Sequence, residues 1–206
     1  MKVKILFIGD SITDCGRLED QEGLGTGYVR LVRDYLLASY PAIPFQFVNV
    51  GISGNRITDL VARWQEDVLN HKPDFVSISI GINDVWRQLD RPDLEQVTPE
   101  LFKSHYIDLV TKVQEQTNAK IILMEPTIIG EQIDSTGNKL LIDYVKIVNE
   151  LADHFKATVI PTHQAFIIFL QSGSTHQLTT DSVHMSSIGN MLMAKTWLKA
   201  VEGLLK

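Results

Sequence analysis

A regular alternation between short apolar runs and longer amphipathic segments constrains the fold of this chain more than any other feature. The apolar runs are Val3–Ile8, Phe45–Val50, Phe75–Ile80, Lys120–Met124 and Thr158–Pro161. Runs of this kind are typical of strands that are buried on both faces of a sheet. The segments between them are predicted as helices over Tyr28–Tyr40, Thr58–Leu69, Glu100–Gln116, Leu140–Phe155, His163–Leu170 and Ser187–Leu204.

Strands that alternate with helices form parallel sheets with helices on both faces. The sequence therefore predicts an α/β fold, a three-layer α/β/α sandwich around a five-stranded parallel sheet. We expect the flavodoxin-like strand order 2-1-3-4-5, in which sites form beyond the carboxyl ends of the strands. The chain has 206 residues, which suits a single domain over residues 1–206.

The spacing of apolar residues predicts which helical positions face the core. These positions are Val29, Val32, Leu36 and Leu37 in the first helix, and Phe102, Ile107, Val110 and Val113 in the third. Thr58 is predicted to cap the second helix. Val85–Pro99 and Pro126–Lys139 are predicted as long loops, and such loops often form the wall of a pocket.

Composition excludes several classes of function. The formal net charge is −6, and no basic cluster is interleaved with aromatic residues, which argues against nucleic acid as a partner. No apolar stretch approaches the roughly 20 residues of a membrane span. The apolar run at the N-terminus ends at Gly9-Asp10-Ser11, too early for a signal peptide. Together with the one cysteine, Cys15, this favours a cytoplasmic location.

Polar clusters follow the predicted strands. They are Gly9-Asp10-Ser11, Gly51–Asn55 and Gly81–Asp84, and a further cluster, Asp181–His184, precedes the last helix. Because a parallel sheet brings the carboxyl ends of its strands to one edge, we expect these distant positions to meet there.

The residue types in these clusters match the needs of nucleophilic catalysis. A serine hydroxyl becomes a nucleophile when a base removes its proton, and a carboxylate can orient that base and stabilise its cation. We therefore predict Ser11 as nucleophile, His184 as base and Asp181 as the orienting carboxylate. The backbone N–H groups of Ser11 and Gly54 and the side-chain amide of Asn83 would stabilise the oxyanion.

This reaction requires no cofactor and no metal. Asp10, Asp14, Asp181 and His184 contain metal-ligating groups, but they lack the usual ligand spacing, so we predict no metal site.

Four sequence blocks resemble those of the SGNH (GDSL-like) hydrolases. The blocks are FIGDSITD, GISGN, GIND and DSVH, and they run from residue 7 to residue 184. The family's name gives the residues that match Ser11, Gly54, Asn83 and His184, and Asp181 matches its triad aspartate. The resemblance implies an SGNH hydrolase fold and a carboxylic-ester hydrolase that works through an acyl-enzyme.

A narrower resemblance is to the bacterial acetylxylan-esterase-type branch. It rests on FIGDSITDCGR, LGTGYV, ARWQEDV and KPDFVSISIGINDVWRQ. It implies a small-molecule or oligosaccharide ester as substrate, with a short acyl group such as acetyl on a carbohydrate. Relatives commonly carry Trp before the triad aspartate and Pro after the histidine, whereas this chain has Thr180 and Met185.

Five further residues are predicted to form or support the substrate pocket, namely Asp10, Asn55, Arg56, Trp86 and Arg87. A polar rim of Arg87, Asn55 and Asp84 would favour sugar esters. A long apolar groove would instead favour a lysophospholipase or thioesterase with the same triad.

Two other interpretations stay open. A flavodoxin-like binding module could hold a flavin phosphate at Ser11-Ile12-Thr13. The final helix has apolar residues around much of its circumference, from Met191 to Leu205, which is consistent either with a fully buried helix or with a homo-oligomer contact.

Overall fold

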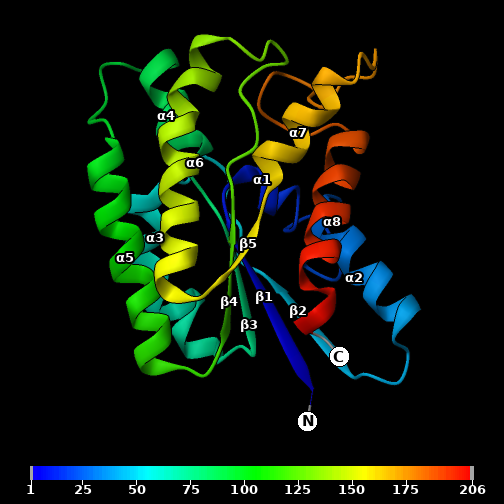
Figure 1. Cartoon of the computed structure of the whole chain (residues 1–206). Coiled ribbons are helices and arrows are strands. Elements are labelled where there is room, and N and C mark those ends of the chain that lie inside the picture. Colours follow the sequence, from blue (N-terminus) through cyan, green and yellow to red (C-terminus); the bar gives the residue numbers. More distant parts are fainter. Residues whose placement is uncertain (1, 205–206) are drawn as a thin grey trace.

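One parallel sheet forms the centre of the molecule in a computed structural model that describes residues 2–204. Its strands are β1 (Val3–Gly9), β2 (Phe45–Asn49), β3 (Phe75–Ser79), β4 (Lys120–Met124) and β5 (Thr158–Ile160). All pairings are parallel and the order is β2-β1-β3-β4-β5 (Figure 1), which confirms the predicted sheet.

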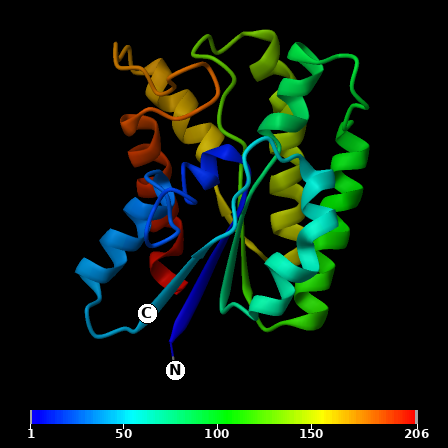
Figure 2. The ribbon, with the colours of Figure 1, turned by 180° about the vertical axis from the view of Figure 1, so that it is seen from behind.

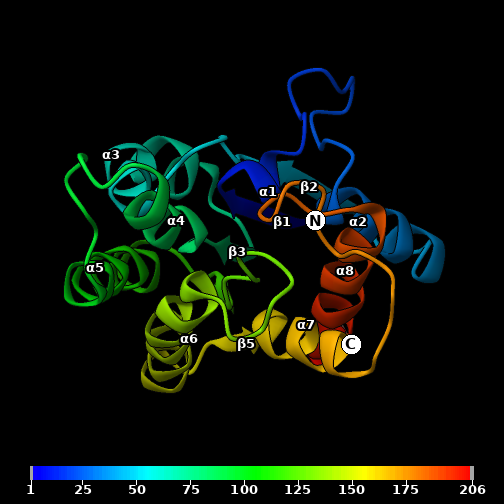
Figure 3. The same ribbon diagram turned by 90° about the horizontal axis from the view of Figure 1, so that it is seen from above.

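Helices cover both faces of this sheet, as the three-layer prediction requires. α2 (Tyr28–Ser39), α7 (Thr162–Gln171) and α8 (Ser187–Val201) lie on one face. On the other face lie α3 (Ile57–Asp67), α4 (Ile82–Asp90), α5 (Pro99–Gln116) and α6 (Thr136–Phe155), as Figure 3 shows from above. The short helix α1 (Ser11–Asp14) follows β1 directly at the upper end of the sheet (Figure 2). Two 3₁₀ turns, η1 (Leu69–His71) and η2 (Glu202–Leu204), complete the described elements.

The core forms where apolar strands meet apolar helix faces. Ile5, Leu6, Phe7 and Ile8 of β1 are fully buried, because the strand has a neighbour on each side and helices on both faces. The Phe7 ring packs against Trp197 of α8 with 5.5 Å between centroids. Burial of these side chains is the main source of stability for the fold.

Two predicted core positions are wrong. Leu37 and Ile107 are each 38% exposed, whereas Val29, Val32 and Leu36 of α2, and Phe102, Val110 and Val113 of α5, are buried. Each helix buries only one stripe of its surface, and these two residues lie outside that stripe.

Helix starts also differ from the prediction. α3 is capped by Arg56, not Thr58, and the Arg56 backbone N–H donates to Asp59 Oδ2 at 2.7 Å. α6 begins four residues earlier than predicted, because the Ser135 hydroxyl accepts from the Asn138 N–H at 3.2 Å and caps the helix there.

The predicted loop Val85–Pro99 is wrong over its first part. α4 continues through this region to Asp90, so a much shorter connection precedes α5. The helix can begin immediately after β3 because Gly81 adopts a φ of 123°, which L side chains rarely adopt.

The final helix is not buried on all sides, since Met191 is 53% exposed while Met193 and Trp197 are fully buried. Leu205, part of the predicted apolar surface, lies outside the described residues. The homo-oligomer contact stays a prediction. Over residues 2–204, none of the helices has the length and apolar character that crossing a membrane requires.

Candidate active site

Ser11 lies at the point where β1 ends and α1 begins, at the carboxyl edge of the sheet. The Asp10 side chain caps α1 by accepting from the Ile12 N–H at 2.9 Å, which fixes the backbone around Ser11. The Ser11 Oγ lies 2.9 Å from the Nε2 of His184. The hydroxyl is therefore within hydrogen-bond reach of a base that is distant from it in the sequence.

Asp181 contacts the other side of the same imidazole. Its Oδ2 lies 2.6 Å from the His184 Nδ1, and its Oδ1 accepts from the His184 N–H at 2.8 Å and the Val183 N–H at 3.1 Å. Partial burial alone would raise the pKa of Asp181, but the hydrogen bonds from the His184 ring and from these two backbone groups together hold it below its usual value. An ionised carboxylate in this position can stabilise a positively charged imidazole.

The segment that carries Asp181 and His184 is held by backbone contacts at its base. Thr179 and Met185 form an antiparallel bridge, and the Thr180 N–H donates to the His184 carbonyl at 2.8 Å. Thr180 also contacts that carbonyl through its hydroxyl at 3.2 Å. Ser182 takes a φ of 75° at the tip, and the Gly130 N–H donates to its carbonyl at 2.7 Å.

Glu131 holds this segment from outside. Its Oε1 accepts hydrogen bonds from the N–H groups of Leu178 and Thr179 at 2.7 and 3.0 Å, and from the Thr179 hydroxyl at 3.2 Å. No sequence signal had marked Glu131, because its partners are nearly fifty positions away.

The residues predicted to stabilise an oxyanion belong to two other strand ends. Gly54 lies between β2 and α3 with a φ of 82°, and no heavy atom beyond its two chain neighbours lies within 4 Å of where a Cβ would be. Asn83 lies in the first turn of α4, and its Nδ2 donates to the Asn55 carbonyl at 3.0 Å. Since an amide nitrogen carries two hydrogens, the second remains available to another acceptor.

A small hollow of about 230 Å³ adjoins Ser11. Besides Ser11 and His184 it is lined by Ile12, Cys15, Gly16, Ser53, Met185 and Asn190. None of the five predicted pocket residues lines it. Ser53, Met185 and Asn190 had not been predicted there, because no local pattern indicates which residues face a hollow.

The predicted pocket residues have other surroundings. The Trp86 ring meets the His184 ring at 84°, with 6.4 Å between centroids. The Arg87 guanidinium lies 4.8 Å above the Trp86 ring and also pairs with Asp90. Arg56 donates to the Glu95 carbonyl at 2.7 Å, and the Asn55 side chain accepts from Arg63 at 2.8 Å.

Asp10 and Asp84 are both buried carboxyls, 1% and 0% exposed. Burial raises the pKa of each to about 7. The Asp84 Oδ1 accepts from the Ile57 N–H at 3.0 Å, so this side chain links α4 to the start of α3. A polar rim that includes Asp84 is not formed, because this side chain is fully buried.

No group of three His, Cys, Asp or Glu side chains within residues 2–204 is arranged to hold a metal ion. The Asp10 side chain already accepts a hydrogen bond from the Ile12 N–H, and the Asp181 side chain contacts the His184 ring.

The similarity of this chain to known proteins agrees with this geometry. The model of the GDSL-like Lipase/Acylhydrolase family matches residues 7–192. An acetylxylan esterase from Geobacillus stearothermophilus is 40% identical over an alignment 205 residues long, and the match covers 96% of this chain and 93% of that protein.

Solved structures of that esterase superpose closely. One has a TM-score of 0.89 at 39% identity and covers 98% of this chain and 96% of the other. Variants of the same esterase with a single serine, aspartate or histidine replaced by alanine are described as catalytic mutants. An α/β hydrolase from the metagenome of Lake Arreo, Spain, has a TM-score of 0.90 at 34% identity, with 98% and 96% of the two chains covered.

The matched blocks, the sheet order and these similarities point to one family. The chain belongs to the GDSL-like lipase/acylhydrolase family of SGNH hydrolases, in the branch of carboxylic-ester hydrolases similar to acetylxylan esterase.

Proposed function

We propose that this enzyme removes acetyl groups from carbohydrate esters, such as acetylated xylo-oligosaccharides, through an acyl-enzyme at Ser11. The observation that carries the proposal is the continuous hydrogen-bonded chain from Ser11 through His184 to Asp181, beside a hollow of about 230 Å³.

The reaction has two stages. The His184 Nε2 accepts the Ser11 proton while Oγ attacks the ester carbonyl, and Asp181 stabilises the imidazolium. The N–H groups of Ser11 and Gly54 and the Asn83 amide bind the oxyanion. The C–O bond to the sugar then breaks and His184 protonates the leaving alcohol. Water, deprotonated by His184, next attacks the acetyl-serine and releases acetate and free Ser11.

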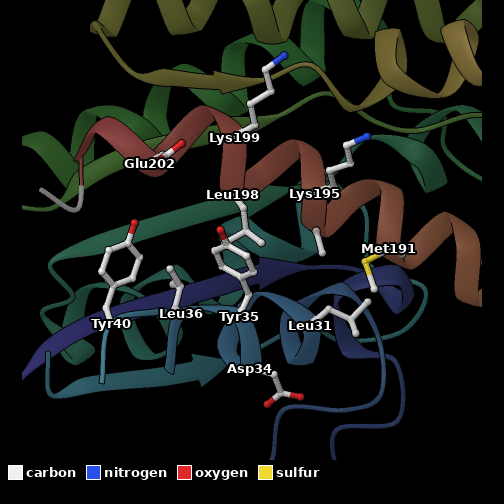
Figure 4. A pocket seen from close by; sticks show the side chains of 11 residues that line it. Leu31, Asp34, Tyr35, Leu36, Tyr40, Met191, Lys195, Leu198, Lys199 and Glu202 are labelled. Carbon is white, nitrogen blue, oxygen red and sulfur yellow. The ribbon is translucent and has the colours of Figure 1, made fainter. Parts of the chain in front are cut away.

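The size of the hollow favours a short acyl group. A long acyl chain needs an extended apolar groove, and the groove of about 640 Å³ between α2 and α8 is lined by residues such as Leu31, Tyr35 and Leu198, with no member of the triad among its lining residues (Figure 4). The lysophospholipase and thioesterase alternatives are therefore not favoured. The binding-module alternative is not favoured either, since the family is one of hydrolases.

Three other inferences from the sequence remain proposals. They are the cytoplasmic location, the organisation of residues 1–206 as one domain, and the homo-oligomer.

The proposal is tested by hydrolysis of p-nitrophenyl esters of increasing chain length, together with acetate release from acetylated xylo-oligosaccharides. We expect fast cleavage of the acetate ester, a steep decline by octanoate, and acetate release from the oligosaccharides. Ser11→Ala should abolish both ester cleavage and acetate release, whereas Ser104→Ala, on the exposed surface of α5, should leave them unchanged.

Either of two results would overturn the proposal. A preference for octanoate would assign the site to long acyl chains. Ester hydrolysis that persists in Ser11→Ala at the rate of the parent protein would remove Ser11 from the reaction.

A further inference from the structure

The segment that carries Gly54 has no regular secondary structure of its own and is held by side chains from other elements. On one side of Gly54, the Asp14 carboxylate accepts from the Ser53 N–H at 3.2 Å and from the Ser53 hydroxyl at 2.7 Å. On the other side, the Asn55 side chain accepts from Arg63. Within the segment, the Asn55 N–H donates to the Ile52 carbonyl at 3.2 Å, so the orientation of the Gly54 N–H depends on this turn and on the two contacts from other elements.

Arg63 of α3 makes four hydrogen bonds with one guanidinium group. Its Nε donates to the Asn55 Oδ1 at 2.8 Å and its Nη2 to the Gly9 carbonyl at 3.1 Å. Its Nη1 donates to the Val50 carbonyl at 2.7 Å and to the Asp67 carboxylate at 2.5 Å. The side chain is only 14% exposed. One guanidinium thus joins the end of β1, the residue that follows β2, and the residue next to Gly54.

The contact with Asn55 extends to Asn83. The Asn55 carbonyl accepts from the Asn83 Nδ2 at 3.0 Å, so the same residue receives Arg63 through its side chain and Asn83 through its backbone. This hydrogen bond uses one of the two amide hydrogens of Asn83 and fixes the direction of the other. The Gly9 carbonyl, in turn, precedes Asp10 and Ser11 in the chain.

We propose that Arg63 is a positioning residue for the oxyanion donors. It keeps the Gly54 N–H and the Asn83 amide at fixed positions relative to Ser11. The inference rests on the proposed function, because it assigns Arg63 a role in stabilising the intermediate of that reaction. Arg63 lies behind the donors and acts through Asn55, Val50 and Gly9.

Arginine suits this role for a geometric reason. Its planar fork presents donors in fixed directions to several acceptors at once, whereas a lysine ammonium is a single point on a flexible stem. Lysine at this position keeps the charge and the pairing with Asp67, but it cannot maintain three separate carbonyl and amide contacts. Arg63→Lys therefore separates the positioning role from a simple ion pair along α3.

The first experiment compares Arg63→Lys with Arg33→Lys, a matched change on α2 where Arg33 pairs with Glu22 and Asp34. Removing one oxyanion donor costs about 10²- to 10³-fold in kcat, and misdirecting donors should cost less. We expect Arg63→Lys to lower kcat about 10- to 100-fold with KM changed by less than about threefold. Arg33→Lys should match the parent enzyme.

The second experiment is a double-mutant cycle with Asn83→Ala. If Arg63 acts through Asn83, its substitution should lower kcat far less once the Asn83 amide is gone. Asn55→Ala removes the side-chain contact with Arg63 without changing the charge and keeps the backbone carbonyl that Asn83 contacts, so it should lower kcat in the same direction. It also tests the inference if Arg63→Lys proves poorly folded by thermal unfolding.

The outcomes separate the two proposals. Loss of activity in Ser11→Ala with full kcat in folded Arg63→Lys and in Asn55→Ala would overturn the positioning role and leave the esterase intact. Additive losses in the cycle would also overturn the joint positioning of both donors by Arg63, since additivity means that Arg63 affects activity independently of Asn83. Unchanged ester hydrolysis in Ser11→Ala would instead overturn the proposed function itself.

Discussion

The Nε2 of His184 lies 2.9 Å from the Oγ of Ser11, although 173 positions separate the two residues in the chain. The contact exists because Ser11 follows β1 and His184 precedes α8, and both of these positions lie at the same edge of the sheet. Asp181 then fixes the imidazole through its Nδ1.

Asp181→Asn should lower kcat on acetyl esters by about 10²- to 10⁴-fold, because an amide neither fixes the productive tautomer of His184 nor stabilises its cation. Thermal unfolding should change little. Asp143→Asn, at a surface ion pair with Lys146, is the matched control and should retain full kcat. Equal activity in both variants would contradict the proposed role of Asp181.

Trp86→Ala should lower kcat/KM roughly fivefold, because the indole packs at a right angle against the His184 ring and such contacts contribute about 1 kcal/mol. Trp86→Phe should retain most of the activity, since a phenyl ring keeps part of that contact. Tyr35→Ala, at an exposed ring of α2, serves as the aromatic control. Full kcat/KM in Trp86→Ala would show that the imidazole needs no support from this side.

Glu131→Ala should reduce the free energy of unfolding by about 1–3 kcal/mol, because three donors of Leu178 and Thr179 would lose their acceptor. Urea denaturation gives the measurement. Glu150→Ala removes an exposed pair with Lys103 and should cost less than about 1 kcal/mol. If the two variants lost the same small amount, Glu131 would not hold the segment that carries the triad.

Asp84→Asn should make stability less dependent on pH. Burial raises the pKa of Asp84 in the folded protein to about 7 from its ordinary 3.8, and the neighbouring Asp10 carboxyl adds to the rise. Between these values the folded state binds more protons than the unfolded state, so the contribution of Asp84 to stability falls as pH rises toward 7. A neutral amide has no such dependence.

Thermal unfolding at several pH values provides the measurement for Asp84→Asn. The Tm difference between Asp84→Asn and the parent protein should shift in favour of the variant by at least about 4 °C between pH 5 and pH 8. Asp90→Asn, on the outer surface of α4, should show a constant difference. A constant difference for Asp84→Asn would mean that this carboxyl ionises normally in the folded protein.

Local sequence patterns determined the strands, most of the helices and the order of the sheet in this protein. Continuous apolar runs such as Val3–Ile8 and Phe75–Ile80 indicated strands buried on both faces, and their alternation with helices indicated a parallel sheet and its order. Because such a sheet brings its strand ends together, the clusters around Ser11, Asn83 and His184 could be assigned to one edge before any coordinates were known.

The tertiary structure alone decided which side chains meet across elements. The spacing of apolar residues predicted that Ile107 faces the core, but the packing of α5 leaves its side chain exposed. A charged residue such as Asp84 is expected at the surface, yet its side chain is fully buried and accepts a hydrogen bond from the Ile57 N–H. The links from Arg63 to Gly9 and from Glu131 to Thr179 join positions far apart in the chain. Such contacts depend on how helices and loops pack in three dimensions, whereas local propensity and spacing specify only the elements themselves.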